Sequence, residues 1–375
     1  MHVAQIIFLP APAGLDAARV FERWPSLADI PQAAASSGIR VSVLQAAAHE
    51  ERVTRHGIDY HFVDISGTKA VIDRGHRFAR LLNDIKADVL HVHGLGFAEE
   101  AFAVAHYLPK LPMLFQDHAD RPPRWWRRPQ WRRWYAAAAG VAFTAIELAQ
   151  PFMTAGLFRP AIPLFAIPES SCRFTLGDRS LARAETGLYG DPCVVWVGHL
   201  SSGKDPLTML DGVARAVEHL PDLQLWCAFG SGPLLAEVQQ RIAGDPRLAG
   251  RLHLLGKVPH ARIERLMQAA DLFVSASLAE SCGYALLEAM ACGAVPVVTD
   301  IPSFRALTDE GRLGSLWPCG DSVRMAEALV HASQDRPSPA QVRAHFDNTL
   351  SFEAVGRKWA QAYAQAHDGA YRGIR

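Results

Sequence analysis

Neither sign of charge is in excess in this chain of 375 residues, because 38 Lys and Arg balance 38 Asp and Glu. The balance excludes general attraction to nucleic acid, and an apolar content of 49% excludes a largely disordered chain. No run of about 18 apolar residues occurs, so no membrane-spanning helix is expected. The N-terminus lacks a basic start before a long apolar stretch, so no signal peptide is expected either.

The six cysteines have neither disulfide nor zinc spacing. None forms a C-x-x-C pair, and all six lie beyond residue 170. This usage is typical of reduced thiols and predicts a cytoplasmic protein. Composition alone therefore predicts a globular α/β chain of enzyme size and assigns no function.

Apolar runs of strand length alternate with stretches of helical periodicity along the chain, which is typical of βαβ units and parallel sheets. The strands expected in the first half are 5–9, 39–44, 61–65, 88–92, 113–115 and 141–144. Those expected in the second half are 193–197, 223–229, 252–255, 272–276 and 294–299. Residues 161–175 contain two prolines and are predicted to be a linker between two doubly wound halves.

A loop rich in glycine and serine joins the strand 193–197 to a helix expected from Pro206. Asp205 is the expected cap of that helix, and Pro206 its first residue. Lys204 then lies just outside a helix N-terminus, where free N–H groups favour anions, so we predict that it binds phosphate. A solvated lysine beside an ordinary cap is the alternative. The loop is not a P-loop, because Asp205 stands where Ser or Thr is required.

The strand 272–276 leads into a loop with Glu280 and then into a helix expected to begin near 282–283. Gly283 keeps the first turn open, so that a ligand can approach the backbone amides. Glu288 lies in this helix among apolar neighbours and therefore needs a partner. Carboxylates at both ends of the element suit a ligand with a central diphosphate: Glu288 would bind a ribose diol and Glu280 a sugar ring.

The segment Glu280-x7-Glu288, followed by Ala-Met-Ala-Cys-Gly, closely resembles the signature of glycosyltransferase family 4. These are the group 1 retaining sugar-nucleotide transferases of GT-B fold. The loop from Gly198 to Lys204 resembles a second landmark of that family, and the loops at Gly230 and at 256–258 are similar to its strand ends around the nucleotide. The resemblance is strongest over residues 192–300.

The resemblance implies a GT-B fold, in which two Rossmann-like α/β domains with parallel sheets face a cleft. Residues 1–168 would form the acceptor-side domain, joined by a returning helix at 351–367, and residues 169–350 the nucleotide-sugar domain. The implied reaction is a retaining transfer of a sugar such as a hexose from a nucleoside-diphosphate sugar to a hydroxyl of a glycan or lipid-linked acceptor, in polysaccharide or glycolipid synthesis. It implies no cofactor and no metal, and the sequence contains no D-x-D triplet.

The resemblance also implies the site residues. His118, Glu280 and Lys204 are the expected catalytic residues, and His118 stands where the family places a histidine near the sugar. The expected donor-binding residues are Gly198, His199, Lys204, Gly230, Gly256, Lys257, Val258, Ser281, Cys282, Gly283 and Glu288. His199 replaces the usual arginine, which predicts a weaker and pH-dependent contact with the diphosphate.

Two further features, the histidine pair on an expected strand and an Arg/Trp-rich segment, each allow more than one interpretation. His91 and His93 alternate on one expected strand, but no nearby carboxylate or cysteine completes a metal site, so structural histidines are favoured. Residues 121–134 contain six Arg and four Trp, which predicts peripheral contact with the inner face of a membrane or with an anionic acceptor. Trp rings packed under a helix with Arg outward, or stacking on nucleic acid, are the competing interpretations, and the neutral remainder disfavours nucleic acid.

Two other functions use the same double fold. A sugar-nucleotide 2-epimerase is possible, although the Glu280-x7-Glu288 element favours transfer. A non-catalytic nucleotide-sugar binder is also possible, because His199 replaces arginine and the loop 10–14 supplies only one glycine after the first strand.

Overall fold

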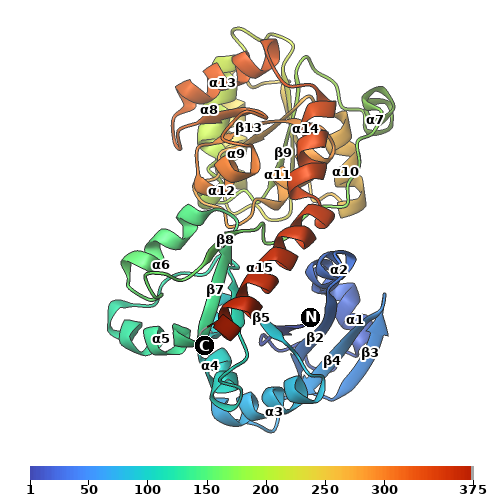
Figure 1. Cartoon of the computed structure of the whole chain (residues 1–375). Helices are drawn as coiled ribbons and strands as arrows, with labels where there is room; N and C mark the ends of the chain where they lie inside the picture. Colours follow the sequence, from blue (N-terminus) through green and yellow to red (C-terminus); the bar gives the residue numbers. More distant parts are fainter. Residues whose placement is uncertain (373–375) are drawn as a thin grey trace. The chain divides into compact units, whose positions relative to one another are not determined.

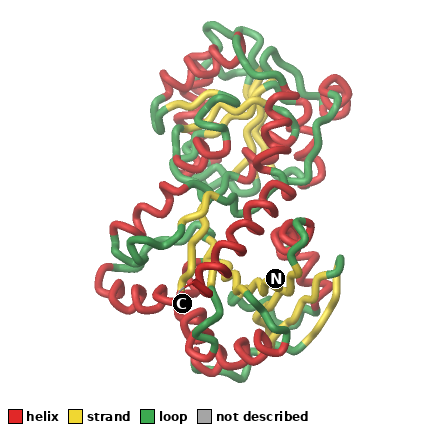
Figure 2. The backbone as a smooth tube through the Cα atoms, viewed as in Figure 1, coloured by secondary structure: helices red, strands yellow, loops and turns green. Residues whose placement is uncertain are grey.

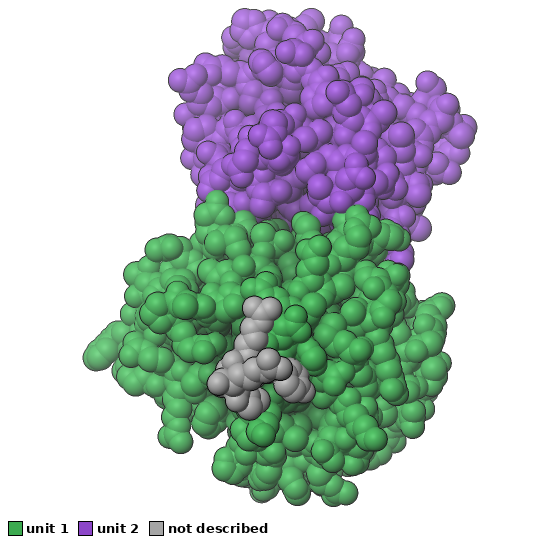
Figure 3. All heavy atoms as spheres, in the orientation of Figure 1, with its two compact units in different colours: residues 1–170, 352–375 green, residues 171–351 purple. Residues whose placement is uncertain are grey.

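The computed structural model describes residues 1–372. The chain divides into two compact units, residues 1–170 with 352–375, and residues 171–351 (Figure 3). The domain boundaries expected from the sequence, 168/169 and 350/351, lie within two residues of these division points.

The first unit contains a sheet with strand order β3-β4-β2-β1-β5-β6-β7-β8, parallel except for the β3–β4 pair. Apart from β3, this is the doubly wound order in which the chain starts in the middle of the sheet and reverses direction once. Val3, Ala4 and Ile6 are fully buried on β1, as a central parallel strand with helices on both faces requires. The strands are β1 (His2–Ile7), β2 (Arg40–Ala47), β3 (Glu51–Arg55), β4 (Ile58–Asp64), β5 (Val89–His93), β6 (Met113–Gln116), β7 (Ala138–Phe143) and β8 (Leu164–Ala166).

Two of these strands were not predicted. β3 is a charged edge strand paired with β4 alone, and its exposed side chains hide the apolar pattern of a strand. β8 lies inside the segment 161–175 that was predicted to be a linker, so that prediction is wrong for Leu164–Ala166. The strand is only three residues long and follows Pro163, whose carbonyl oxygen accepts from Val141 N at 3.0 Å.

Helices cover the sheet of the first unit (Figure 2). They are α1 (Ala17–Arg23), η1 (Pro25–Ala28), α2 (Asp29–Ser36), α3 (Val71–Asp84), η2 (Leu95–Phe97), α4 (Ala98–Tyr107), η3 (Trp125–Arg127), α5 (Arg128–Trp134), η4 (Tyr135–Ala137), η5 (Ile146–Ala149), α6 (Gln150–Thr154) and α15 (Phe352–Arg372). Among the described residues, no helix combines the length and the apolarity needed to cross a bilayer.

The C-terminal helix α15 belongs to the first unit, as expected for a returning helix, and packs beside α2 (Figure 1). A Cβ on Gly356 would lie 2.0 Å from the carbonyl oxygen of Ala33, so only glycine allows the two helices to approach this closely. Residues spaced three and four apart bury one face of the helix in the core: Val355, Trp359, Ala362, Tyr363 and Ala366.

The second unit contains a fully parallel sheet with the order β11-β10-β9-β12-β13-β14, again a doubly wound arrangement. Its strands are β9 (Cys193–Gly198), β10 (Gln224–Phe229), β11 (Leu252–Gly256), β12 (Leu272–Ser275), β13 (Val295–Thr299) and β14 (Ser315–Trp317). Its helices are α7 (Arg179–Thr186), η6 (Ser202–Lys204), α8 (Pro206–Ala216), α9 (Leu235–Gly244), α10 (His260–Ala269), α11 (Tyr284–Ala291), α12 (Pro302–Leu307), α13 (Ser322–Gln334), α14 (Pro339–His345) and η7 (Phe346–Leu350).

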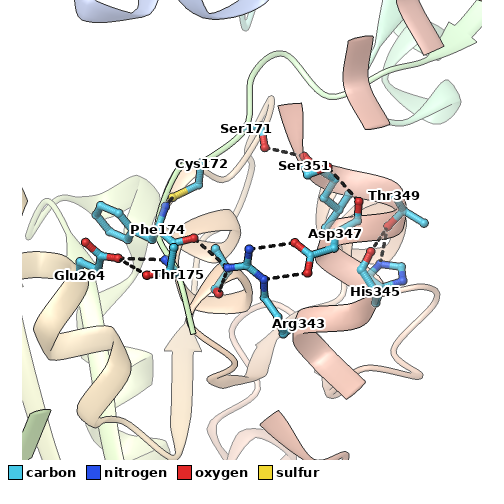
Figure 4. Close-up of polar contacts among 12 residues, drawn as sticks. Ser171, Cys172, Phe174, Thr175, Glu264, Arg343, His345, Asp347, Thr349 and Ser351 are labelled. Carbon is cyan, nitrogen blue, oxygen red and sulfur yellow. Dashed lines mark hydrogen bonds and ion pairs between the residues drawn. The ribbon is translucent and has the colours of Figure 1, made fainter. Parts of the chain in front are cut away.

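The chain enters and leaves the second unit at adjacent points. Ser171 Oγ donates to the carbonyl oxygen of Leu350 at 2.5 Å (Figure 4 draws the polar contacts around Ser171). Arg343 pairs with Asp347 and also donates to the carbonyl oxygen of Phe174 at 2.8 Å, so the entering and leaving segments are tied together. Both connections to the first unit therefore start from one hydrogen-bonded region.

Candidate functional site

The loop after β9 is built as the sequence predicts. Asp205 caps α8 by accepting from Thr208 N, and Pro206 is the first residue of the helix. Asp205 has φ +42°, in the left-handed region that Asp adopts more readily than most residues. This reversal ends η6 and places Lys204 immediately before the N-terminus of α8.

Lys204 Nζ forms an ion pair with Glu280, which follows β12. The two loops are also joined by backbone, because Leu278 N donates to the carbonyl oxygen of Gly203 at 3.0 Å. The side chains of Lys204 and Glu280 are 29% and 16% exposed, so the alternative of a freely solvated lysine does not hold. Two of the expected catalytic residues thus lie together, and an anion that binds Lys204 must compete with the Glu280 carboxylate.

His199 lies at the same edge of the sheet. Its Nδ1 is 2.9 Å from Ser231 Oγ, and a Cβ on Gly230 would lie 3.2 Å from the His199 ring. Gly230 N donates to the carbonyl oxygen of Gly198 at 3.2 Å. Gly198, His199 and Gly230 are therefore contiguous, at the carboxyl ends of β9 and β10 where ligands of doubly wound sheets bind.

The loop after β11 supplies the next predicted group. Gly256 ends the strand with φ +66°, a left-handed conformation that favours glycine. Lys257 is exposed, and Val258 is half-buried and packs against the core of the second unit. The role of Lys257 in donor binding stays a prediction.

The helix expected near residues 282–283 begins at Tyr284, with Gly283 as its N-cap at φ +76°. A Cβ on Gly283 would lie 2.7 Å from the ring of Phe304. The expectation that this glycine leaves the first turn open is therefore incomplete, because an aromatic ring occupies the space beside it. Cys282 is buried in the core of the second unit, and Ser281 is half-buried.

Glu288, within α11, has the partner that its apolar helix requires. Its Oε1 lies 2.7 Å from His260 Nε2, and its side chain is 15% exposed. Burial raises the pKa of Glu288, and the hydrogen bond and charge of His260 oppose that rise. His260 is the first residue of α10, and its ring lies 5.0 Å from the ring of Phe174. His260 was not predicted as a site residue, although it stands directly after the loop 256–259.

His118 follows β6 in the first unit and lies between two partners. Its Nδ1 is 2.8 Å from Glu169 Oε1, and its Nε2 is 3.2 Å from His93 Nδ1. Desolvation lowers the pKa of His118, but the hydrogen bond and charge of Glu169 outweigh it, so the pKa is raised. Glu169 was not predicted as a site residue. It lies next to the polar stretch 170–173, which gives no strand or helix pattern.

Asp117 and Asp120 hold the loop that carries His118. Asp120 accepts from Leu95 N at 2.7 Å and from Gly96 N at 2.9 Å, and its own N–H donates to Asp117 Oδ1 at 3.0 Å. Asp117 is buried, which raises its pKa to about 6. The backbone bond from Asp120 opposes this rise but does not cancel it.

A cavity of about 440 Å³ lies beside His118 within the first unit. Its apolar wall comes mainly from β1 and the α1–α2 region, and its polar residues come from β2, from the end of β5 and from the loop after β6. The lining residues are Ile7, Leu9, Trp24, Ser26, Leu27, Pro31, Gln45, His93, Gly94, Phe97, His118 and Asp120. None of them is Lys or Arg, so the histidines are the groups of the lining that can carry positive charge.

His91 is a packed, hydrogen-bonded histidine, as favoured from the sequence. It is fully buried, and its ring nitrogens lie 2.8 Å from Tyr363 Oη and 3.1 Å from Gln116 Oε1. Within residues 1–372, no group of three or more His, Cys, Asp or Glu side chains is arranged to hold a metal ion.

The Arg/Trp segment 121–134 divides into two parts. Trp134 is buried and Trp131 packs against the core, as the interpretation with rings under a helix predicts. Trp125 and Trp126 precede α5 and are 73% and 55% exposed. The Arg124 guanidinium lies 5.3 Å from the ring centre of Trp126, so the exposed part carries apolar surface and positive charge together.

Comparison with known proteins finds a family match within the second unit. Residues 191–335 match the family described as glycosyl transferases group 1. The D-inositol 3-phosphate glycosyltransferase of Nocardia farcinica is 29% identical over 202 residues, which cover 52% of this chain and 45% of that protein. The phosphatidyl-myo-inositol mannosyltransferase of Mycolicibacterium smegmatis is 32% identical over 163 residues, covering 43% of this chain and 40% of that protein. The chain thus matches less than half the length of these relatives.

Solved structures show the same fold over nearly the whole chain. Anabaena HepE in complex with UDP and glucose has a TM-score of 0.68 and 17% identity, covering 97% of this chain and 99% of that one. A glycosyltransferase from Rickettsia africae has a TM-score of 0.70 and 11% identity, covering 97% and 98%. Sucrose-phosphate synthase from Thermosynechococcus elongatus has a TM-score of 0.65 and 16% identity, covering 98% and 99%. Both units are Rossmann-like, and the fold is GT-B, as predicted.

Proposed function

We propose that this chain of GT-B fold is a group 1 glycosyltransferase and that it transfers a sugar from a nucleoside-diphosphate sugar to a hydroxyl group of an acceptor. The observation that carries the proposal is the pairing of Lys204 with Glu280 at the sheet edge from which α11 presents Glu288. One cation and two carboxylates are the groups required by a ligand with a diphosphate between two hydroxylated rings.

The donor is held by the second unit in this proposal. Lys204 and His199 bind the diphosphate, and the amides at 281–283 contribute from the N-terminus of α11. Glu288 binds the ribose diol, and Gly230 with the loop 256–258 lines the nucleotide. The UDP named with Anabaena HepE supports a nucleotide ligand for this fold.

The chemistry proposed for the site is retaining and uses no metal. Lys204 gives its charge to the leaving diphosphate, and preorganised donors aimed at developing charge are often the largest single contribution to catalysis. Glu280 then orients the sugar once Lys204 has exchanged its carboxylate partner for phosphate.

The acceptor is proposed to bind at the first unit, beside His118. The cavity there offers an apolar wall and a polar end, which suits a hydroxylated ring or a lipid-linked glycan. The named substrates of the relatives, D-inositol 3-phosphate and phosphatidyl-myo-inositol, are hydroxylated molecules of this general kind. We place the reaction in the synthesis of a glycan or glycolipid.

A peripheral membrane contact completes the proposal. Trp125 and Trp126 are exposed next to a run of arginines, and this combination of amphipathic rings and cations is typical of interfaces with anionic lipid. The contact would bring the first unit to lipid-linked acceptors.

Incubation with UDP-, GDP- and ADP-sugars tests the proposed function directly. A transferase releases nucleoside diphosphate slowly from one donor alone and rapidly once the acceptor is added, with or without a chelator. A 2-epimerase converts the donor sugar to its epimer, and a binder gives a thermal shift without either product. The first result supports transfer; either of the others overturns it.

A further inference from the structure

A chain of hydrogen bonds in the first unit starts and ends on the same residue. It leaves the backbone carbonyl of Glu169, runs through buried side chains of β1, β5, β6 and α15, and returns to the Glu169 carboxylate. Because a carbonyl oxygen accepts only, the first bond has a fixed direction, and the neutral state of the two buried histidines His91 and His93 passes that direction along the chain.

The first two steps fix the proton of His91. Gln116 Nε2 donates to the Glu169 carbonyl at 3.0 Å, so Gln116 Oε1 faces His91 Nε2 at 3.1 Å. His91 therefore carries its proton on Nε2. Complete burial lowers the pKa of His91 to about 3, so the ring is neutral and its Nδ1 accepts.

The next steps run through α15. Since His91 Nδ1 accepts, Tyr363 donates its phenol proton to it at 2.8 Å. The phenol oxygen then accepts from Gln5 Nε2 at 3.2 Å. This places Gln5 Oε1 3.1 Å from His93 Nε2, and His93 must donate.

The last steps decide the state of His118. Burial and the neighbouring histidines hold the pKa of His93 well below its usual value, so His93 is neutral and its Nδ1 accepts. The partner of that nitrogen is His118 Nε2 at 3.2 Å, which must carry a proton. His118 Nδ1 lies 2.8 Å from the Glu169 carboxylate and carries a proton as well.

We propose that Tyr363 is a positioning residue, which acts through Gln5 and His93 to hold His118 as an imidazolium at the edge of the cavity. Both ring nitrogens of His118 are then donors. As a role in transfer, which rests on the proposed function, His118 gives a positive charge to an electron-rich acceptor or sugar oxygen and does not remove a proton from the acceptor hydroxyl.

The charges around His118 act in the same direction. Glu169, Asp117 and Asp120 face it from the loops after β8 and β6, and each carboxylate stabilises a cation there. His93 and His91 face it from β5, and both are neutral. The lining of the cavity adds no Lys or Arg that would repel the imidazolium.

NMR titration of the imidazole nitrogens of His118 tests the proposal without any need for activity. Wild-type protein should show His118 protonated on both nitrogens at pH 6.5. Tyr363→Phe removes the bond that fixes Gln5, so the amide can turn and His93 can donate to His118. The titration midpoint of His118 should then fall by about half a pH unit or more.

Tyr60→Phe is the matched control, because Tyr60 is a buried phenol of the same core cluster whose hydroxyl has no hydrogen-bond partner in the described structure. It should leave the midpoint of His118 unchanged. A wild-type His118 with one proton at pH 6.5, or equal midpoints in all three proteins, overturns the proposal.

A second pair of variants keeps the test valid if Tyr363→Phe folds poorly. Gln5→Leu removes the acceptor for His93 and should lower the midpoint of His118. Gln5→Glu keeps an acceptor at that place and should not lower it. If Gln5 only supports the local structure, both variants should change the titration midpoint of His118 equally. That result would contradict the proposal. Failure of transfer with every donor, with these shifts still present, would refute the proposed function alone.

Discussion

The carboxylate of Glu288 accepts a hydrogen bond from His260 Nε2 at 2.7 Å, and this contact joins the helices α10 and α11. The carboxylate is mostly buried, whereas the histidine side chain is 74% exposed. An exposed ring can turn into solvent at little cost, so it can be exchanged for a ligand hydroxyl. In the proposed donor complex, the ribose takes the place of His260 on Glu288.

Removal of this competitor should strengthen donor binding. His260→Ala frees the Glu288 carboxylate, and loss of a competing hydrogen bond of about 1 kcal/mol corresponds to up to about fivefold tighter binding. Isothermal titration with the productive nucleotide sugar measures the change. His219→Ala removes another exposed histidine of the second unit and should have no effect. Weaker binding by His260→Ala would show that the ring contacts the donor itself.

Asp117→Asn should stabilise the first unit at alkaline pH. Burial raises the pKa of Asp117 to about 6, so the folded state binds this proton more tightly than the unfolded state. Wild-type stability is therefore lost as the pH rises from about 4 to about 6. A shift of about two units corresponds to about 2–3 kcal/mol above pH 6.

Urea unfolding at pH 4.5 and pH 8 checks this prediction. Asp117→Asn keeps an acceptor for Asp120 N and should gain stability at pH 8 but little at pH 4.5. Asp59→Asn, by contrast, should lose stability at both pH values, because hydrogen bonds from Thr54 and Arg52 lower the pKa of Asp59 and its carboxylate is ionised at pH 4.5 as well as at pH 8. A pH-independent effect of Asp117→Asn would contradict the assignment of a buried, ionised carboxylate.

Replacement of the exposed tryptophans should reduce membrane binding. We expect the double variant Trp125→Ser and Trp126→Ser to lower sedimentation with anionic vesicles several-fold, because both rings lie outside the core. Leu181→Ser is the matched control, since Leu181 is 54% exposed in the second unit. Equal sedimentation of all three proteins would exclude this contact.

The arginines of the same segment are a poorer test. Arg132 Nε donates to the carbonyl oxygen of Gly156 at 2.6 Å, and Arg128 Nε is buried. Substitution at either position removes local structure as well as charge. The tryptophan pair separates the membrane contact from folding, because neither ring packs in the core.

Local sequence patterns predicted the individual elements of the donor site better than they predicted which residues lie close together in space. Asp205 and Pro206 are visible as a helix start, because capping depends on residues a few positions apart. Lys204 and Glu280 are 76 residues apart, and they meet only because β9 and β12 are neighbours in the sheet. The strand order that creates this switch point is a property of the whole domain.

The site residues and strands that were not predicted lie where the local sequence pattern is weak. His260 and Glu169 stand in or beside loops, where no period marks which side chain turns toward the site. β8 is too short to show alternation, and β3 carries charges on an edge. The buried hydrogen-bond chain through Tyr363 joins Gln5 and Tyr363, which are 358 residues apart in the sequence. The packing of α15 against the first unit brings them together.

The most direct test of the account is the turnover of Lys204→Met with the productive nucleotide sugar and acceptor. Lys204 is the fixed cation paired with Glu280, and loss of one preorganised donor of this kind typically costs ~10²–10³ in rate. We predict a loss of that size in kcat, with the fold retained by circular dichroism and full activity in the control Lys110→Met, which changes an exposed lysine of the first unit. A Lys204→Met enzyme with wild-type kcat would contradict the assignment of the donor site.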